Sequence, residues 1–345
     1  MPFTKNFIPL IKNGQNLPPL PSISDIIHLY KLSAIRQLAQ NFILDMNLTR
    51  KIVKQAGNLK GSHVCEIGPG PGGITRAILE NNINELAVIE KDKRFLPSLQ
   101  ILADSVTSET KMSIYHADIL KFQMDSIFPQ NVATSWSETD SNINIIGNLP
   151  FNISLPLLLR WLREMDARND LFALGRVKMT LTFQKEIAER MIALPGSNQR
   201  SRLSVITQSL AHVDHKFTFL GKACVPQPQV DVGVVNIHPK EKPTYEMSFD
   251  IFHKVVTSIF NFRQKFCKRG VENLFPLPVK DEMTHEIFHK LPHIHPSTPI
   301  FKLENEHFND IAHAYLEIVQ RIPGLVDYDY RQPKSQQHLW AQNMF

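Results

Sequence analysis

Cysteine is scarce in this sequence. Its 345 residues include three cysteines, Cys65, Cys224 and Cys267, and no two of them have the Cys-x-x-Cys spacing. An odd number of widely separated cysteines argues against both a disulfide framework and a thiolate zinc site. Four histidines lie between residues 285 and 295, but Pro292 interrupts any helical face that could gather them. We therefore predict no metal site and interpret these histidines as solvated loop residues.

Long apolar runs are also absent, since none approaches the roughly 20 residues that span a bilayer. We expect no membrane insertion. Acidic residues are missing from residues 1–24, which carry Lys5, Lys12 and several apolar side chains. This composition resembles a mitochondrial transit peptide and predicts a protein of the mitochondrial matrix. Because serine and arginine are few in this segment, an extension that is disordered or contacts RNA stays open as an alternative.

The composition that is present suits a globular protein of two domains. Hydrophobic residues make up 43% of the chain, which is ample for a core, and the length fits two domains on the usual size range. A formal net charge of +5 favours a polyanionic partner without establishing one.

The first informative stretch runs from Val64 to Thr75 and is typical of a strand, a glycine-rich loop and a helix. Its loop holds four glycines within residues 68–73, which let a ligand approach the main chain closely. The spacing also fits G-x-G-x-x-G, with Glu90 about 20 residues further on, where an acid suits a ribose diol. A dinucleotide site and a plain connecting turn are therefore open alternatives.

Two details favour S-adenosylmethionine over a dinucleotide. Glu66 lies two residues before the first glycine, and Pro69 and Pro71 leave fewer backbone amides for a pyrophosphate. The Glu-x-Gly-x-Gly pattern resembles the first motif of Rossmann-like methyltransferases. Asp118 follows a further strand predicted from residue 112, where it could accept a hydrogen bond from an adenine amino group or cap a helix.

The second informative stretch is Asn148-Leu149-Pro150-Phe151, directly after a strand predicted over residues 143–146. Ligands in open α/β sheets bind beyond the carboxyl ends of the strands, so this tetrapeptide should face the glycine loop. An adenine amine is a poor nucleophile, and acceptors such as Asn148 Oδ1 and the carbonyl oxygen of Leu149 or Pro150 favour its attacking form. Pro150 restricts these carbonyls, and Phe151 offers a ring for a flipped base. A turn with a capping asparagine is the alternative.

Four motifs in order resemble the KsgA-type rRNA adenine dimethyltransferase family, and the segments 181–186, 225–235 and 262–270 resemble its mitochondrial branch. The match spans roughly residues 30–240 and consists of Gln40-Asn41-Phe42, Glu66-Ile67-Gly68-Pro69-Gly70, Asn148-Leu149-Pro150-Phe151 and Gln184-Lys185-Glu186 with Arg202-Leu203-Ser204. The resemblance implies a seven-stranded Rossmann-like α/β domain with a smaller C-terminal helical domain. It also implies S-adenosylmethionine-dependent N6,N6-dimethylation of two adjacent adenosines in the 3′-terminal stem-loop of mitochondrial small-subunit rRNA.

The same resemblance assigns the cofactor contacts position by position. The expected cofactor-binding residues are Leu38, Asn41, Ile43, Gly68, Gly70, Glu90, Lys91, Asp118, Ile119 and Asn148. The family has leucine at position 43 and its bacterial members have tyrosine at position 151, and we expect both departures to leave activity intact. Asn41 and Phe42 could instead be residues that simply lead into a helix.

Cations on two segments are candidates for RNA binding. They are Arg200 and Arg202 in a loop predicted over residues 194–202, and Arg263, Lys265, Lys268 and Arg269 after an apolar helix predicted over residues 249–262. Such side chains bind phosphates or simply add solubility. We expect a targeting segment at 1–24, a methyltransferase domain at 25–240, a helical RNA-contacting domain at 246–325 and a disordered tail at 326–345.

Two other functions compete with rRNA methylation. A dehydrogenase would share the first βαβ unit but gives no reason for Asn-Leu-Pro-Phe after the fourth strand. A mitochondrial transcription factor that kept the fold is the more serious alternative, and the transcription machinery is then a partner. The favoured partner is small-subunit rRNA or the assembling small ribosomal subunit, and we expect a monomer.

Overall fold

The computed structural model describes residues 17–20, 41–138 and 140–333. The chain divides into two compact units, one of residues 1–188 and 214–241 and the other of residues 189–213 and 242–345. The second unit thus takes a segment from the middle of the sequence as well as the C-terminal part. Leu38, most of the expected targeting segment and residues 334–345 of the expected tail lie outside the described residues.

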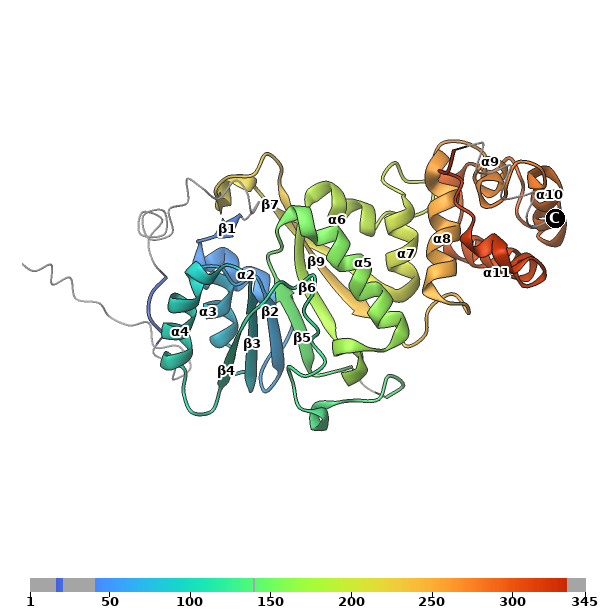
Figure 1. The fold of residues 1–345 in the computed structure, drawn as a ribbon. Coiled ribbons are helices and arrows are strands. Elements are labelled where there is room, and N and C mark those ends of the chain that lie inside the picture. The colour runs from blue at the N-terminus through green and yellow to red at the C-terminus, as the bar shows by residue number, and fades with distance from the viewer. Residues whose placement is uncertain (1–16, 21–40, 139, 334–345) are drawn as a thin grey trace, which may run out of the picture. The chain divides into compact units, whose positions relative to one another are not determined.

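The first unit is built on a seven-stranded sheet (Figure 1) with the order β4-β3-β2-β5-β6-β9-β7. Strands β4, β3, β2, β5 and β6 pair in parallel, and β9 pairs antiparallel with β6. The strands are β2 (His63–Ile67), β3 (Glu85–Glu90), β4 (Lys111–His116), β5 (Ile143–Gly147), β6 (Lys178–Gln184), β7 (Ala211–Phe219) and β9 (Val232–Pro239). The predicted seven-stranded α/β fold is confirmed.

The register of the parallel strands gathers the residues that follow them. Ile67 lies opposite both Ile89 and Gly147, and Glu90 lies opposite His116. Strands β2, β3, β4 and β5 therefore end at the same edge of the sheet. The central strands are buried along their length, as expected for parallel strands covered on both faces.

Helices cover this sheet with apolar faces. Ile78 of α3 and Leu99 of α4 pack in one cluster with Val64, Leu86 and Val88 of the sheet. The helices of the N-terminal part are α2 (Met46–Lys54), α3 (Gly73–Leu79), α4 (Leu96–Ser105), α5 (Phe151–Ala167) and α6 (Lys185–Met191). Strand–loop–helix order around the glycine loop is as the sequence predicts.

A two-stranded sheet joins segments far apart in the sequence. In it β1 (Phe42–Ile43) pairs antiparallel with β8 (Cys224–Val225). Asn41 precedes this short strand and Phe42 begins it. Helix α2 starts three residues after Ile43, so the segment also leads into a helix, as the alternative holds. The Phe42 ring packs against the glycine loop so closely that a Cβ on Gly70 would lie 2.7 Å from Phe42 Cε1.

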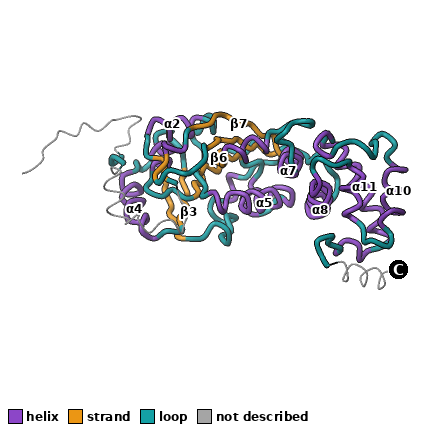
Figure 2. Tube along the Cα trace, turned by 90° about the horizontal axis from the view of Figure 1, so that it is seen from above, coloured by secondary structure: helices purple, strands orange, loops and turns teal. Residues whose placement is uncertain are grey.

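The second unit is helical. Its helices are α7 (Arg202–Leu210), α8 (Phe249–Ile259), α9 (Cys267–Val271), α10 (Lys280–Lys290) and α11 (Asn305–Arg321), and Figure 2 shows helices and loops without strands around α8, α10 and α11. His285 and His289 lie in α10, so the loop assignment for these two histidines is wrong. Tyr328 lies inside the expected tail but is only 3% exposed. Just before the tail, the Tyr315 hydroxyl donates to Leu325 O over 3.0 Å. The start of the expected tail is therefore packed.

Two properties of the described residues bear on function. No helix among them combines the length and the apolar character that crossing a membrane requires. Within the same residues, no group of three or more histidine, cysteine, aspartate or glutamate side chains could hold a metal ion.

Candidate active site

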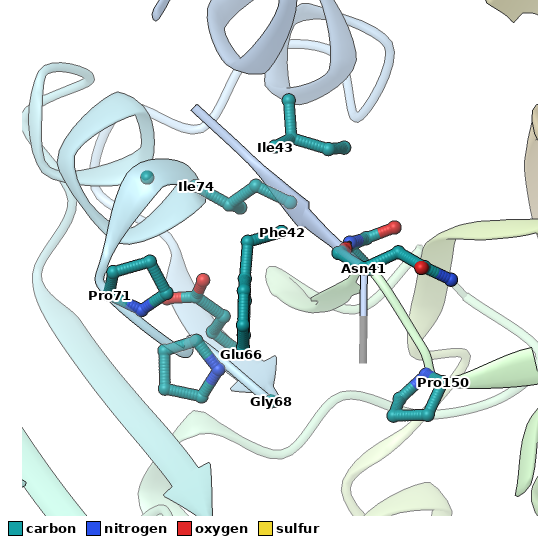
Figure 3. Close-up of a pocket in the computed structure, with 11 residues that line it drawn as sticks. Asn41, Phe42, Ile43, Glu66, Gly68, Pro71, Ile74 and Pro150 are labelled. Carbon is teal, nitrogen blue, oxygen red and sulfur yellow. The ribbon is translucent and has the colours of Figure 1, made fainter. Parts of the chain in front are cut away.

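Two cavities that share Gly68 and Pro150 lie where the parallel strands end. The larger has a volume of about 510 Å³ and is lined by residues at or just after the ends of β2, β3 and β4, including Glu90, Lys91, Asp118 and Ile119. The smaller is lined by Asn41, Ile43, Glu66, Gly68 and Asn148, among others. Figure 3 shows Glu66, Gly68 and Pro71 on one side of the smaller cavity and Asn41 and Pro150 on the other.

The glycine loop is shaped by backbone conformations that other residues rarely adopt. Gly68 has φ +67° and Gly70 has φ +54°. This shape directs the Gly70 N–H to Glu90 Oε2 over 3.0 Å, while the Asp92 N–H donates to Glu90 Oε1 over 2.7 Å. Burial raises the pKa of Glu90, and these two backbone hydrogen bonds oppose that rise. The carboxyl group is thus held at the end of β3, and each oxygen retains a second lone pair for a ligand hydroxyl.

Glu66 places a second buried carboxyl group beside the first. It is 1% exposed, and its Oε2 has no hydrogen-bond partner among the described residues. Burial, together with the neighbouring Glu90, raises the pKa of Glu66 to about 8. A buried polar atom without a partner is costly, and Glu66 is one of the residues that line the smaller cavity. The sequence reasoning used Glu66 to choose between cofactors but did not assign it to the site.

Asp118 lies at the rim of the larger cavity two residues beyond β4. Its Oδ2 accepts from Lys91 Nζ over 2.8 Å and its Oδ1 accepts from the Leu120 N–H over 3.1 Å. The hydrogen bond from Lys91 is the main reason that the pKa of Asp118 lies below its usual value. No helix follows Asp118 directly, so its backbone contact closes a turn, and the carboxylate is ionised where it meets the cavity.

Asn148 is fixed by two partners that define its amide orientation. Its Nδ2 donates to Asn41 O over 2.5 Å, and its Oδ1 accepts from Thr182 Oγ1 over 2.7 Å. An amide oxygen has two lone pairs, so Oδ1 keeps one acceptor site after the bond from Thr182. Thr182 is fully buried on β6, and sequence reasoning missed it. The signal was present in the alternation of Thr180 and Thr182 with apolar residues on a buried strand.

Of the three residues that follow Asn148, one lines the cavities and two pack in or against the core. Pro150 has φ −55° and lines both cavities, whereas Leu149 is buried at 2% exposure. Phe151, the first residue of α5, is partly buried against a cluster that includes Ile43 and Phe219. Its ring does not line either cavity, so stacking of a base on Phe151 requires the part of the ring that stays exposed.

Two of the arginines expected to bind RNA have structural roles instead. Arg200 is 0% exposed, and its guanidinium donates to Ala193 O, Gln208 Oε1 and Asn305 Oδ1 at 3.0, 3.0 and 2.6 Å. Burial lowers the pKa of Arg200 to about 10. The expectation that Arg200 contacts phosphates is wrong, because its donors are enclosed within the second unit. Arg263 likewise donates to the carbonyl oxygens of Ser197, Asn198 and Arg200.

The other four cations of the expected RNA-binding set are exposed. Arg202 is the first residue of α7, and Lys265, Lys268 and Arg269 surround the start of α9. Arg269 also forms an ion pair with Glu272 at 3.0 Å. The structure thus keeps four of the six cations at the surface and places the other two in contacts with backbone carbonyls.

The cavities fit S-adenosylmethionine on their own chemistry. The larger one has the volume of a small-molecule site, and Glu90 with Asp118 offers acceptors for a ribose and an adenine. The unpartnered Glu66 Oε2 offers a buried hydrogen-bonding position to a ligand group. When bound, this cofactor supplies a methyl group activated by a sulfonium.

Comparison with known proteins agrees with this geometry. Residues 32–317 match the family described as ribosomal RNA adenine dimethylase. The chain is 46% identical to the mitochondrial dimethyladenosine transferase 1 of Xenopus tropicalis and to that of Homo sapiens, in each case over 92% of this chain and 90% of the relative.

Solved structures show the same fold. A dimethyladenosine transferase from Plasmodium falciparum aligns with a TM-score of 0.61 and 21% identity, over 80% of this chain and 96% of that one. The 23S rRNA methyltransferase ErmE aligns with a TM-score of 0.54 and 18% identity, over 80% of this chain and 99% of that one. The chain belongs to the ribosomal RNA adenine dimethylase family, in its mitochondrial branch, and is an S-adenosylmethionine-dependent RNA methyltransferase.

Proposed function

We propose that this enzyme transfers two methyl groups to N6 of each of two adjacent adenosines in the 3′-terminal stem-loop of mitochondrial small-subunit rRNA. The enzyme then acts as a monomer in the matrix, on free rRNA or on the assembling small subunit. The curated relatives are named dimethyladenosine transferases, which supports the product.

The observation that carries the proposal is the fixed amide of Asn148. Asn41 O holds Nδ2 and the Thr182 hydroxyl holds Oδ1, so the free acceptor site of Oδ1 has a fixed direction. An acceptor in that place receives a hydrogen bond from the N–H of an adenine amine. This hydrogen bond orients the amine so that the nitrogen lone pair points toward the methyl group. Bound S-adenosylmethionine would supply the methyl group, and Asn148 Oδ1 would hold the amine toward it while the N6 proton leaves to water.

Cofactor-binding residues are proposed on the same basis. We assign the ribose hydroxyls to Glu90, the adenine amine to Asp118, and the wall around the base to Ile119 and Lys91, which line the larger cavity. Asn41, Ile43, Gly68 and Asn148 line the smaller cavity beside Glu66, and we propose that the methionine part reaches them from the larger cavity past the shared Gly68 and Pro150.

Methylation of a transcript tests the proposal. The purified chain is incubated with the 3′-terminal stem-loop RNA and S-adenosylmethionine, and the nucleosides are analysed by mass spectrometry. We expect N6,N6-dimethyladenosine at the two adjacent positions and none in a matched transcript with guanosines there. Methylation of another RNA class with the stem-loop left unmodified contradicts the assigned substrate.

A further inference from the structure

Phe266 is an exposed aromatic side chain on a fixed backbone. It is 57% exposed and precedes the first residue of α9. Its neighbours hold the chain on both sides, since the Ile300 N–H donates to Lys265 O over 3.0 Å and the Cys267 N–H donates to Thr298 O over 2.7 Å. Phe266 itself forms a β-bridge with Pro299. Because Cys267 is fully buried, the adjacent ring is directed outward.

Cations flank Phe266 in the sequence. Lys265 and Lys268 are exposed, and no carboxylate of the described residues lies within 4.0 Å of either ammonium group. Arg269 adds a further charge, which Glu272 partly neutralises. Among the described residues of the second unit, the other large exposed apolar side chains, such as Leu277 at 39% exposure, have no aromatic face. Phe266 thus combines an open π face with unneutralised positive charge.

This combination fits a single-stranded nucleic acid better than other ligands. Nucleobases stack on aromatic rings regardless of sequence, and lysines beside the ring contact the phosphates on either side of the stacked base. Single exposed apolar residues are common and need no ligand. Here, however, fixing the backbone reduces the entropy lost on binding, and the charges select a polyanion.

We propose that Phe266 stacks on an unpaired base of the RNA substrate, with Lys265 and Lys268 on the flanking phosphates. The surface formed by these three residues is termed the Phe266 platform. The inference rests on the proposed function for the identity of the RNA but not for the stacking contact. We leave Arg200 and Arg263 out of the platform, because Arg200 is buried and Nε and Nη2 of Arg263 donate to carbonyl oxygens of the second unit.

Binding of the full chain to the stem-loop RNA with its single-stranded flank tests the platform. We expect Phe266→Ala to weaken binding about 5- to 150-fold, the range for loss of one stacked base. Phe266→Trp should restore affinity, whereas Phe266→Leu, which keeps apolar area without a π face, should not. The pair Lys265→Ala and Lys268→Ala should reduce the slope of log affinity against log salt by about 1.4.

Leu277→Ala is the matched control, since it removes an exposed apolar side chain of the same unit and should bind RNA normally. Denaturation curves should show that the Phe266 variants stay folded. Normal RNA affinity of Phe266→Ala, or full rescue by leucine, overturns the platform. Competition by an acidic peptide that needs Phe266, with RNA binding unaffected, would assign the surface to a protein partner instead.

Turnover measurements separate this inference from the proposed function. Phe266→Ala should raise the RNA KM and leave kcat at saturating RNA and the affinity for S-adenosylmethionine unchanged. If the unaltered chain binds the RNA through Phe266 but does not methylate it, the proposed function fails and the platform stands. If it methylates the RNA and Phe266→Ala has an unchanged KM, the platform fails alone.

Discussion

Two regions of the molecule differ in how well the sequence predicts which residues face a ligand. They are the edge of the sheet in the first unit and the arginine-containing segments of the second unit. At the sheet edge, Glu90, Asp118 and Asn148 all line cavities, because the parallel register brings the ends of their strands together. In the second unit, Arg200 and Arg202 are two residues apart, yet one is enclosed and the other exposed. Position in a regular sheet therefore predicts a site better than a run of like charges does.

The largest expected effect is on Asn148. Asn148→Ala should lower the single-turnover rate about 10²- to 10³-fold, which corresponds to roughly 3–4 kcal/mol for the loss of a preorganised polar contact. Asn152→Ala, which changes an exposed amide lining the larger cavity, is the matched control and should change the rate little. Both are measured at saturating S-adenosylmethionine, and a near-normal rate for Asn148→Ala contradicts its role.

In the second unit, the enclosed Arg200 and the exposed Arg202 should differ in their contribution to stability. Arg200→Ala should lower the free energy of unfolding by about 3 kcal/mol, because it leaves the side-chain oxygens of Gln208 and Asn305 without the donor that Arg200 supplies. Arg202→Ala should change it by less than about 0.5 kcal/mol. Urea denaturation of both variants measures this. A stable Arg200→Ala that had lost RNA binding would return Arg200 to the interface.

The burial of Glu66 at the sheet edge should make the free energy of unfolding depend on pH. Between its ordinary pKa of 4.5 in the unfolded chain and about 8 in the folded chain, the folded state retains a proton that the unfolded state releases. The free energy of unfolding should therefore fall as pH rises through this window, by up to about 1.4 kcal/mol per unit.

Glu66→Gln removes this titration. The unfolding free energy of the variant, minus that of the unaltered protein, should rise between pH 5 and 8 and then level off. Denaturation in the absence of cofactor at several pH values checks this difference. A difference that does not change with pH would mean that Glu66 is ionised throughout.

The smallest expected effect is on Thr182. Thr182→Val keeps the volume but removes the hydroxyl that donates to Asn148 Oδ1, and we expect kcat to fall about 5- to 10-fold, consistent with one hydrogen bond. Thr182→Ser should restore kcat, and the affinity for S-adenosylmethionine should stay constant in both variants. A loss that serine fails to restore would indicate packing rather than positioning of the amide.

The sequence by itself determined the strand, glycine loop and helix and the polar residues at the strand ends. These features depend on local properties, namely backbone conformations available to glycine, the restriction imposed by proline and the apolar runs of central strands. The same local order predicted Glu90 and Asn148 in one site, because consecutive parallel strands end at one edge.

Only the tertiary structure decided which polar groups face a ligand. Arg200 is enclosed by Asn305, which is 105 residues away in the sequence, and Thr182 reaches Asn148 across 34 residues. Strand β1 reaches the glycine loop through its pairing with β8. Burial and hydrogen bonding depend on neighbours brought together by folding, so a cation, a threonine or a phenylalanine acquires its role only when those neighbours are in place.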